Sequence, residues 1–590
     1  MTISRLFKTN KLLIRLMNIG LIFFTLGYSK PSDTVNRNNL FKYIETDKAR
    51  YNIGESVEFH LTLAEPIEKS TLLINYYFEG ILIGTEALKI SLQKSIYWSW
   101  QPPLVDYCGY LVEVFLSDNP NNQEKITIAV DVSSSWNKYP RYGFVSKYPQ
   151  MTDATIDSVI KRLNRFHING VQFYDWHNTH HDPLKGTVDA PEETWQDIAN
   201  RTIYQLTVEK YINTVHKYNM KAMAYNLLYG AWSSGFQEGV QREWGLYIDL
   251  NHQEPFRLNM PDGWADDIYF MNPADPDWKN YIFEKMNKTF RILDFDGWHV
   301  DQIGDLGVLY TYEGDSVILK DTFTSFLSEA KVSLNTKLVM NAVAQYGWAE
   351  IDRAPVEFLY NEVWKPDSTF NDLVRILDQN RTISGKNTVL PAYMNYNKSS
   401  QSGFFNTPGI LLTDAVIFSN GGAHLELGEH MLCHEYFPND NLKMTLKLEK
   451  ALVSYYDFSV AYQTLLRSPQ LRSYEMIISS DEVPLQSMAQ KGTVWSFSKS
   501  IGNKTIVHFI NLMKVEDINW RDANGAQTEP DLIFNLLVNI NEQKTVKSVK
   551  AISPDFMYGL PENVPYNQTN GLLEIKIPFL KYWTAIILEY

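Results

Sequence analysis

The chain has 590 residues, more than one hydrophobic core organises, so about two to four domains are expected. Its residues are 44% hydrophobic and 21% charged, a composition that excludes an intrinsically disordered chain. The formal net charge of −14 argues against nucleic acid as a partner, because an acidic surface repels a polyanion, and favours a neutral substrate.

Residues 1–29 are predicted to be an export signal peptide. Basic residues precede a short apolar run at 19–26: Arg5, Lys8, Lys11 and Arg15. This run is too short to span a bilayer of about 30 Å but suits a signal peptide. No later segment is apolar enough to cross a membrane. The mature protein is therefore expected in the periplasm or outside the cell, without a membrane span and as a monomer.

Residues 34–133 show the alternation of apolar and polar residues that is typical of β-strands. Alternating segments recur between Gly, Pro and Asn turns at 57–63, 71–78, 110–116 and 126–132. This spacing predicts an immunoglobulin-like β-sandwich. We expect it to pack beside a catalytic domain and to carry no chemistry of its own.

Residues 138–470 alternate strand-like with helix-like segments, which indicates parallel β-α units. Strands are predicted at 141–146, 170–176, 221–226, 297–301, 337–342, 358–364, 388–396 and 423–429. Helices are predicted between them, for example at 153–167, 202–218, 278–293 and 370–381. This count predicts a central (β/α)8 TIM barrel. The long insertion at 227–275 is expected to shape the substrate cleft.

Residues 480–590 are predicted to form a second, C-terminal β-sandwich. Strand-like segments lie at 493–500, 504–512, 547–554, 572–580 and 582–590. The chain has two cysteines, Cys108 and Cys433, which fall in different predicted domains. Their spacing predicts neither a disulfide nor a metal site, and no cofactor is expected.

Acidic residues close several predicted barrel strands, where the active site of such a barrel lies. Strand 2 ends at Asp175, strand 4 at Asp301 and strand 6 at Glu362. Further acids are Asp305 in the next loop and Glu426 and Glu429 on strand 8. Cleavage of a glycosidic bond needs two carboxyl groups, one to protonate the leaving oxygen and one to attack the anomeric carbon or activate water.

Asp301 and Glu362 are the candidate catalytic pair, because strands 4 and 6 are expected to face each other across the barrel mouth. The alternative is structural: rim carboxylates also pair with Arg or Lys, or cap the following helix. The segment at 172–184 contains His177, His180 and His181. Their spacing and Pro183 favour a loop over a zinc site, with hydrogen bonding to sugar hydroxyls as the alternative role.

Four segments carry a family resemblance: RYGFVSKYP (141–149), LNRFHINGVQFYDWHNTHHDPL (163–184), FDGWHVDQIGD (295–305) and FLYNEVW (358–364). They are similar to glycoside hydrolase family 66, which contains endo-dextranases and cycloisomaltooligosaccharide glucanotransferases. The resemblance covers nearly the whole mature chain. It implies a retaining mechanism with Asp301 as nucleophile and Glu362 as general acid/base.

The resemblance also implies an α-glucan substrate, dextran, and a subsite for the cleaved sugar. The residues expected to line this subsite are Asp175, Tyr174, His177, Asn226, Trp298, Trp364 and Asn395. The transferases of the family carry an additional carbohydrate-binding module within the barrel. The barrel region here leaves no room for one beyond 227–275, which favours hydrolysis.

Two alternatives remain at this point. One is a glucanotransferase or another α-glucan hydrolase on the same barrel. A transferase shares the covalent intermediate, and other α-glucan hydrolases share the strand-4 aspartate. The other is a non-catalytic glycan-binding protein. The presence of both carboxylates argues against the second alternative, and turnover of dextran distinguishes the two classes.

Overall fold

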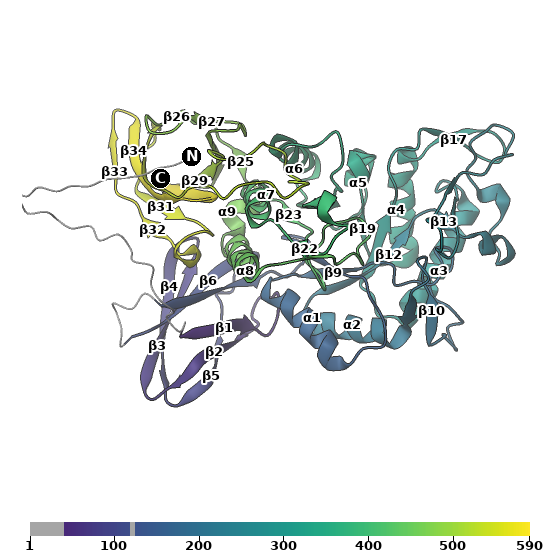
Figure 1. Ribbon diagram of the computed structural model, residues 1–590, viewed down its shortest axis with the longest axis horizontal. Helices are drawn as coiled ribbons and strands as arrows, with labels where there is room; N and C mark the ends of the chain where they lie inside the picture. The colour runs from purple at the N-terminus through teal and green to yellow at the C-terminus, as the bar shows by residue number, and fades with distance from the viewer. Residues whose placement is uncertain (1–39, 118–123) are drawn as a thin grey trace, which may run out of the picture. The chain divides into compact units, whose positions relative to one another are not determined.

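The computed structural model describes residues 40–117 and 124–590 (Figure 1). The export signal predicted for residues 1–29 lies outside the described residues. Among the helices of the described part, none is both long and apolar enough to cross a membrane.

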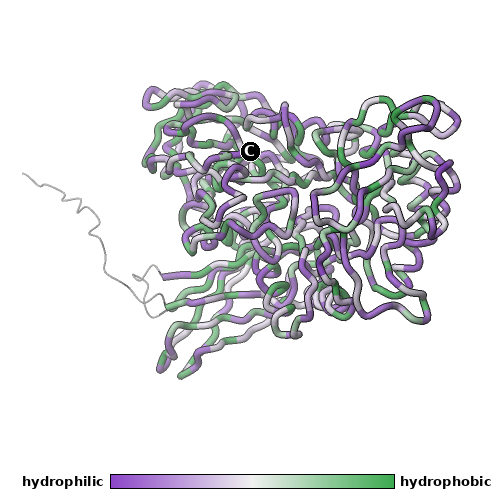
Figure 2. Tube along the Cα trace, turned by 45° about the vertical axis from the view of Figure 1, so that its right-hand side comes forward, coloured by the Kyte–Doolittle hydropathy of each residue, from purple (hydrophilic) through white to green (hydrophobic). Residues whose placement is uncertain are grey.

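Two antiparallel sheets form the N-terminal region. One has the order β1 (Phe41–Thr46), β2 (Val57–Ile67), β5 (Gln93–Trp100), and the other β4 (Ile81–Ile90), β3 (Ser70–Phe78), β6 (Cys108–Leu116), β7 (Lys125–Val132). Figure 2 shows hydrophobic and hydrophilic residues alternating along these strands. The apolar faces share one core, in which Phe59 stacks on Trp98 with ring centroids 4.7 Å apart. The strand–turn–strand start expected from YIETDKARYNIGESVEF (43–59) corresponds to β1 and the beginning of β2. The sequence did not single out β4 and β5; β4 pairs only with β3 and is mostly exposed, so it lacks a buried face.

Parallel strands make up the central region. Within the described residues they are β8 (Tyr142–Val145), β9 (Gly170–Phe173), β12 (Lys221–Leu227), β16 (Gly297–Asp301), β19 (Lys337–Met340), β20 (Leu359–Tyr360), β21 (Thr388–Leu390) and β23 (Ala423–His424). They form one sheet of order β19-β16-β12-β9-β8 and another of order β20-β21-β23. Two isolated parallel bridges, Asn341 with Tyr360 and Phe144 with Gly428, join the ends of these sheets. The carboxyl ends of all these strands therefore meet at one edge.

A helix follows each parallel strand in the chain. These helices are α1 (Asp153–Arg165), α2 (Gln205–Lys217), α3 (Pro276–Ile292), α4 (Lys320–Leu334), α5 (Trp348–Arg353), α6 (Phe370–Ser384), α7 (Thr407–Ser419) and α8 (Leu446–Ala461), with α9 (Gln463–Arg467) after them. Neighbours such as α1 and α2 pack side by side (Figure 1). Thr369 and Asp372 form a capping box at the start of α6. Helix α7 is buried nearly all round, because it contacts α6, α8 and the C-terminal strand β29.

The loops after the parallel strands contain short strands. They are β10 (Thr194–Gln196), β11 (Thr202–Tyr204), β13 (Gly230–Ala231), β14 (Arg257–Leu258), β15 (Ile268–Phe270), β17 (Val308–Tyr310), β18 (Ser316–Ile318), β22 (Gly403–Phe404) and β24 (Leu442–Lys443). The helix predicted at 202–218 was therefore too long, since its first three residues pair with β10. The predicted strands 358–364, 388–396 and 423–429 were also too long. Beyond β20 and β21 the pairing of the two segments continues as single backbone hydrogen bonds, such as Val363 N to Pro391 O at 3.0 Å.

Two further sheets form the C-terminal region (yellow in Figure 1). One has the order β25 (Arg472–Ser473), β28 (Val494–Ile501), β29 (Lys504–Asn511), β35 (Trp583–Glu589), β31 (Ser548–Ile552), β32 (Glu562–Asn563), with β27 (Leu485–Gln486) beside β28. The other is β26 (Ile478–Ser479), β30 (Ile533–Asn541), β34 (Leu572–Leu580), β33 (Tyr566–Thr569). The loop 512–532, between β29 and β30, leaves these sheets and contacts the parallel-strand region. Asn395 N donates to Arg521 O at 3.0 Å there.

Candidate active site

Asp301 and Glu362 lie at the shared edge of the parallel strands. Asp301 ends β16, and Glu362 follows β20 by two residues. The side chain of Asn341, which follows β19, lies between them. Its Nδ2 donates to Asp301 Oδ1 at 3.0 Å and to Glu362 Oε2 at 2.9 Å. The structure therefore brings the predicted pair together around one amide group.

Each carboxylate has a second donor on its far oxygen. Tyr225 in β12 donates its hydroxyl to Asp301 Oδ2 at 2.9 Å. Tyr393, beyond β21, donates to Glu362 Oε1 at 2.7 Å. Both tyrosine rings are buried, so the two carboxylates are held in fixed orientations by rigid strands.

The two carboxyl groups differ in their electrostatic surroundings. The pKa of Glu362 is raised to about 7, by burial first and by the neighbouring charge of Asp301 second, against the hydrogen bonds from Tyr393 and Asn341. Burial also raises the pKa of Asp301, while the hydrogen bonds from Asn341 and Tyr225 lower it. Near neutral pH, Glu362 is therefore able to give and take a proton, which suits a general acid/base.

Asp175 and Tyr174 lie at the end of β9, beside this pair. Asp175 is buried and takes a left-handed backbone conformation with φ 45°. Burial raises its pKa to about 8, and the positive charge of Arg201, 3.9 Å away, opposes that rise. The Tyr174 ring stacks on Phe437 with centroids 4.4 Å apart. These side chains form a wall with both an aromatic face and a polar group, as a sugar ring requires.

The three clustered histidines differ in their hydrogen bonds. His177 is buried, and its two ring nitrogens have no hydrogen-bond partner within the described residues. Burial lowers its pKa to about 3, so the ring is neutral. His180 accepts from the indole of Trp232 at 2.9 Å, and His181 from the backbone of Trp232 at 3.2 Å. Of the three, His177 is the ring whose two nitrogens are both buried without a hydrogen-bond partner in the described part of the chain.

Trp364 lies two residues after Glu362 and is partly exposed. Its side chain lies close enough to the Glu362 carboxyl group to lower the pKa of that group. The ring centroid lies 5.6 Å from that of Tyr393. Trp364 is thus in direct contact with the candidate acid/base.

Three other predicted site residues are engaged elsewhere. Asn226 is fully buried and donates to His180 O at 2.9 Å. Trp298 is fully buried and packs against Phe326 of α4. Asn395 is fully buried and donates to Asp522 O at 2.7 Å. The structure does not bring these three side chains to the two carboxylates, because their contacts face the helix layer or the C-terminal loop.

The remaining predicted acids form no group with the pair either. Asp305 is exposed and accepts from Gly307 N at 2.9 Å. Glu429 accepts from the hydroxyl of Ser146 at 2.7 Å. Glu426 belongs to a buried cluster with Asp414 and His424.

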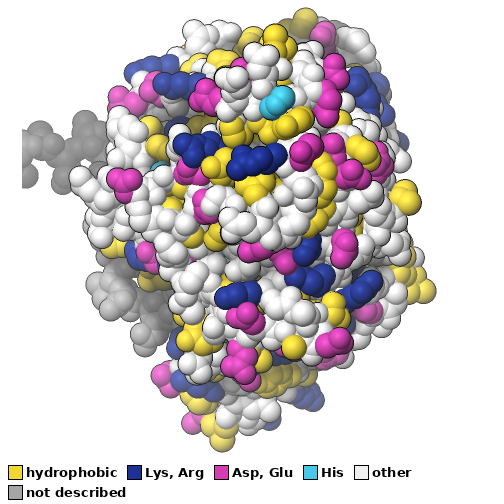
Figure 3. All heavy atoms as spheres, turned by 90° about the vertical axis from the view of Figure 1, so that its right-hand side faces the viewer, with side chains coloured by type: hydrophobic (Ala, Val, Ile, Leu, Met, Phe, Trp, Pro, Cys, Tyr) yellow, Lys and Arg dark blue, Asp and Glu magenta, His cyan; other side chains and the backbone are white. Residues whose placement is uncertain are grey.

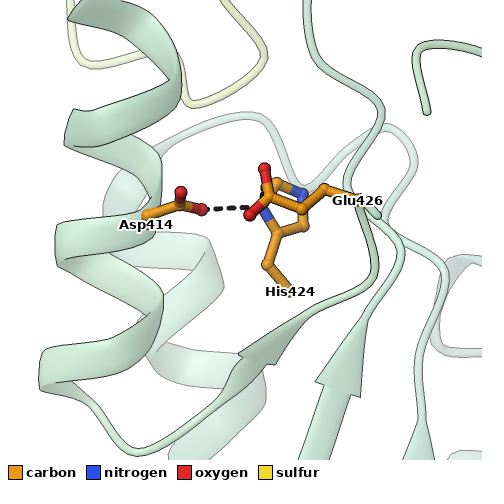
Figure 4. Close-up of side chains that lie close together, drawn as sticks. All are labelled: Asp414, His424 and Glu426. Atoms are coloured by element: carbon orange, nitrogen blue, oxygen red, sulfur yellow. Dashed lines mark hydrogen bonds and ion pairs between the residues drawn. The ribbon is translucent and has the colours of Figure 1, made fainter. Parts of the chain in front are cut away.

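Figure 4 shows this cluster, whose potential ligand atoms lie within 4.8 Å of one another and are of the types that hold metal ions. His424 Nε2 must donate to the carbonyl of Ala392, 2.9 Å away, so in a neutral ring Nδ1 is an acceptor. Asp414 Oδ1 lies 2.8 Å from Nδ1, and burial raises the pKa of Asp414 well above its usual value. A protonated Asp414 therefore satisfies Nδ1 without a metal.

Sequence reasoning missed Asn341, Tyr225 and Tyr393. All three lie within segments predicted as strands, near the carboxyl ends. A search for acids alone passes over neutral donors. Polar residues at the ends of otherwise apolar strands were the available signal, because burying them there needs a partner.

The surface charge is mixed rather than of one sign. On the face in Figure 3, Asp and Glu side chains are interspersed with Lys and Arg. The net charge of −14 does not gather into one field on this face. A polyanionic or polycationic partner has no extended complementary patch there.

Comparison with known proteins gives consistent matches. A family model described as glycosyl hydrolase family 66 matches residues 46–587. A cycloisomaltooligosaccharide glucanotransferase of Niallia circulans is 26% identical, covering 92% of this chain and 71% of the relative. A dextranase of Streptococcus salivarius is 24% identical, covering 82% and 68%. The crystal structure of a Paenibacillus cycloisomaltooligosaccharide glucanotransferase complexed with cycloisomaltoheptaose has a TM-score of 0.87 at 26% identity, covering 93% of this chain and 99% of that one.

Proposed function

The chain belongs to glycosyl hydrolase family 66, and from that premise we propose that it is a retaining endo-hydrolase of α-1,6-glucan (dextran) that releases isomaltooligosaccharides. The relatives support an α-glucan as substrate, since one is named a dextranase and another was crystallised with cycloisomaltoheptaose. The proposed catalytic pair is Asp301 and Glu362.

The observation that carries the mechanism is the amide nitrogen shared by the two carboxylates. Asn341 Nδ2 donates both hydrogen bonds, at 3.0 and 2.9 Å. The two accepting carboxylate oxygens therefore lie roughly 6 Å apart at most. Retaining enzymes place their carboxyl groups about 5–5.5 Å apart, and inverting enzymes about 6.5–9.5 Å. An oxygen separation of this size is compatible with the retaining arrangement and supports direct attack by one carboxylate.

In the proposed mechanism, Glu362 donates its proton to the glycosidic oxygen as that oxygen leaves. The Asp301 carboxylate attacks the anomeric carbon, so the bond to the leaving oxygen breaks and a covalent glucosyl-Asp301 ester forms. The Glu362 carboxylate then takes a proton from water, whose oxygen attacks the same carbon. The ester breaks, Asp301 leaves as carboxylate, and the sugar keeps its α configuration.

The subsite for the cleaved sugar is proposed to include Asp175, Tyr174, His177 and Trp364. The ring nitrogens of His177 have no hydrogen-bond partner among the described residues, Asp175 supplies a polar group, and the half-buried Tyr174 supplies an aromatic side chain. These side chains border the catalytic pair: the Tyr174 ring lies 5.0 Å from that of Tyr225, which donates to Asp301. Asn226, Trp298 and Asn395 are not retained in this set, because their amides and indole are committed to other contacts.

The fold proposed for residues 138–470 is a (β/α)8 barrel. The two bridges that join the ends of the parallel sheets and the helix after each strand support it. The flanking sandwiches are proposed at 34–133, of immunoglobulin-like type, and at 480–590. Export by residues 1–29 and a monomeric state are proposed with them, and cell fractionation and gel filtration test both.

Glucan transfer is the second candidate function, favoured by the relatives named glucanotransferases. The alignment with the Niallia enzyme runs over 703 positions, more than this whole chain of 590, so that enzyme carries segments that this chain lacks. This supports hydrolysis. The Paenibacillus structure, matched over 99% of its length, supports transfer.

Digestion of dextran tests the proposal. Wild type, Asp301→Ala and Glu362→Ala are incubated with dextran, and the products are separated by chain length and linear or cyclic form. Linear isomaltooligosaccharides from wild type and near-total loss in both variants are expected. Cyclic products would favour transfer. Binding of dextran without any product would favour a non-catalytic glycan-binding protein and contradict the proposal.

A further inference from the structure

A loop from the C-terminal sheets reaches the edge where the two carboxylates lie. The loop 512–532 is held there by hydrogen bonds: Phe370 N to Ile518 O at 3.0 Å, Trp520 Nε1 to Asp367 O at 2.9 Å, Thr413 Oγ1 to Trp520 O at 2.8 Å and Asn395 N to Arg521 O at 3.0 Å. These bonds tie the loop to the segments that follow β20 and β21. The position of its side chains is therefore fixed relative to Glu362.

Arg521 lies near the middle of this loop and contacts the segment directly after Glu362. Its Nη2 donates to Val363 O at 2.9 Å. Its guanidinium lies 4.8 Å from the ring centroid of Trp364 and 5.1 Å from that of Tyr396. A planar guanidinium stacks on such rings and hydrogen-bonds at the same time, which an ammonium does less well.

The contacts of Arg521 lead to Glu362 by two short paths. Val363 follows Glu362 in the chain, so the bond to its carbonyl fixes the backbone at the carboxyl group. Trp364, whose ring Arg521 covers, lies next to the Glu362 side chain and lowers the pKa of its carboxyl group. Losing Arg521 thus frees both the backbone and the ring that hold the acid/base.

We infer that Arg521 is a positioning residue, supplied by the C-terminal β-region, that holds Trp364 and the Glu362 carboxyl group in their working orientation for glycoside cleavage. This inference rests on the proposed function of Glu362. It makes the C-terminal region a part of the active site rather than a separate module.

The positive charge of Arg521 also influences the pKa of Glu362, and this effect is measurable in the pH–rate profile. The titratable groups that interact with Glu362 include Asp301 from β16, Tyr360 from β20, Tyr393 and Tyr396 beyond β21, and Arg521. Arg521 is the only cation among them, and it favours the ionised carboxylate. Removing it raises the pKa of Glu362, so Glu362 stays protonated to higher pH and the alkaline limb of kcat/KM moves upward.

The test compares Arg521→Ala, Arg521→Lys and the control Lys514→Ala. Lys514 lies on the same loop, is exposed and pairs with Asp531, so its removal takes one charge from the loop without touching the site. For Arg521→Ala we expect kcat to fall about 10- to 100-fold, as for a misplaced catalytic group, and the alkaline limb to shift upward. Arg521→Lys keeps the positive charge, so the alkaline limb of kcat/KM should stay at its wild-type pH. Its kcat should recover only in part. Lys514→Ala should change neither.

Two outcomes would overturn the inference. Unchanged kcat and an unmoved limb in Arg521→Ala, with wild type active, would remove the positioning role and leave the proposed function intact. Wild type without activity would instead contradict the proposed function. In that case a crystal structure of Arg521→Ala still decides the positioning role, because a Trp364 ring that stays in place contradicts it.

Discussion

The carboxylates of Asp301 and Glu362 accept hydrogen bonds from one nitrogen, Nδ2 of Asn341, at 3.0 and 2.9 Å. The orientation of that amide is fixed, because its Oδ1 accepts from the backbone N of Glu362 at 3.3 Å. Only the NH2 end is therefore available to the two acids. One neutral side chain thus sets the distance between the proposed nucleophile and the proposed acid/base.

Substitution of Asn341 should lower kcat more than it raises KM. Asn341→Ala removes the donor that both carboxylates share, and we expect kcat to fall about 10- to 100-fold as their geometry loosens. It also raises the pKa of Glu362, so the alkaline limb of the pH–rate profile moves upward. Steady-state kinetics across pH measures both effects. Asn287→Ala serves as control, because the Asn287 side chain lies on α3 and donates to the carbonyl of Ser333. Equal effects in both variants would contradict the role of Asn341.

The activity of wild type should follow a bell-shaped pH profile. Glu362 must be protonated to act as general acid, so kcat/KM falls as pH rises through its pKa of about 7. Asp301 must be ionised to attack, so kcat/KM also falls as pH drops through the pKa of Asp301. A profile that stays flat from neutral to alkaline pH would contradict the proton-donating role of Glu362.

Two tyrosines allow a matched comparison. Tyr393→Phe removes the donor to Glu362 and should shift the alkaline limb to higher pH, because the neutral acid is then favoured. Tyr225→Phe removes the donor to Asp301 and should shift the acidic limb to higher pH instead. Each substitution removes one hydrogen bond to a charged group, a type that contributes about 1.5–3 kcal/mol. Both limbs moving together in either variant would argue against separate roles for the two carboxylates.

Asp175 should make the protein less stable as pH rises. Its pKa is raised to about 8 in the folded chain, compared with about 3.9 in an unfolded one. Its stabilising contribution is therefore complete below about pH 4 and is lost as pH rises towards 8. Asp175→Asn keeps a neutral side chain that tolerates the left-handed backbone, so we expect it to be more stable than wild type by roughly 1 kcal/mol or more near pH 8.

Thermal melts at a fixed scan rate, between about pH 5 and pH 8, measure this difference. The difference in melting temperature between Asp175→Asn and wild type should increase with pH. A constant gap, or a wild type that is more stable at pH 8, would show that Arg201 already compensates the buried charge. Dextran cleavage by the variant tests its subsite role separately.

The proximity of Asp301 and Glu362, the proposed catalytic pair, was predictable from the sequence, because acids that end apolar strands need a reason to be buried. Asp301 closes GWHVD, where the predicted strand matched β16 in both bounds. The supporting donors were not predictable in the same way. Whether Asn341 and Tyr393 face the acids depends on strand pairing across the sheet, which one sequence does not specify.

Other misses have similar physical causes. Asn226 and Trp298 lie on strands beside the site, but side chains alternate between the two faces of a strand, and theirs face the helices. Arg521 lies some 160 positions after Glu362 in a loop without any periodic pattern, so only the three-dimensional structure brings the two together. The strands predicted at 358–364 and 423–429 were too long, because beyond β20 and β23 the pairing continues only as single backbone hydrogen bonds.

The most direct test of the central claim is azide rescue of Asp301→Ala and Glu362→Ala with an activated α-glucoside, read by the anomeric configuration of the glucosyl azide in proton NMR. If Asp301 is the nucleophile, azide takes its place in Asp301→Ala and gives the β-azide. If Glu362 is the acid/base, azide attacks the covalent ester in Glu362→Ala and gives the α-azide. The opposite pair of anomers, or the same anomer from both variants, would contradict the assignment of the two carboxylates.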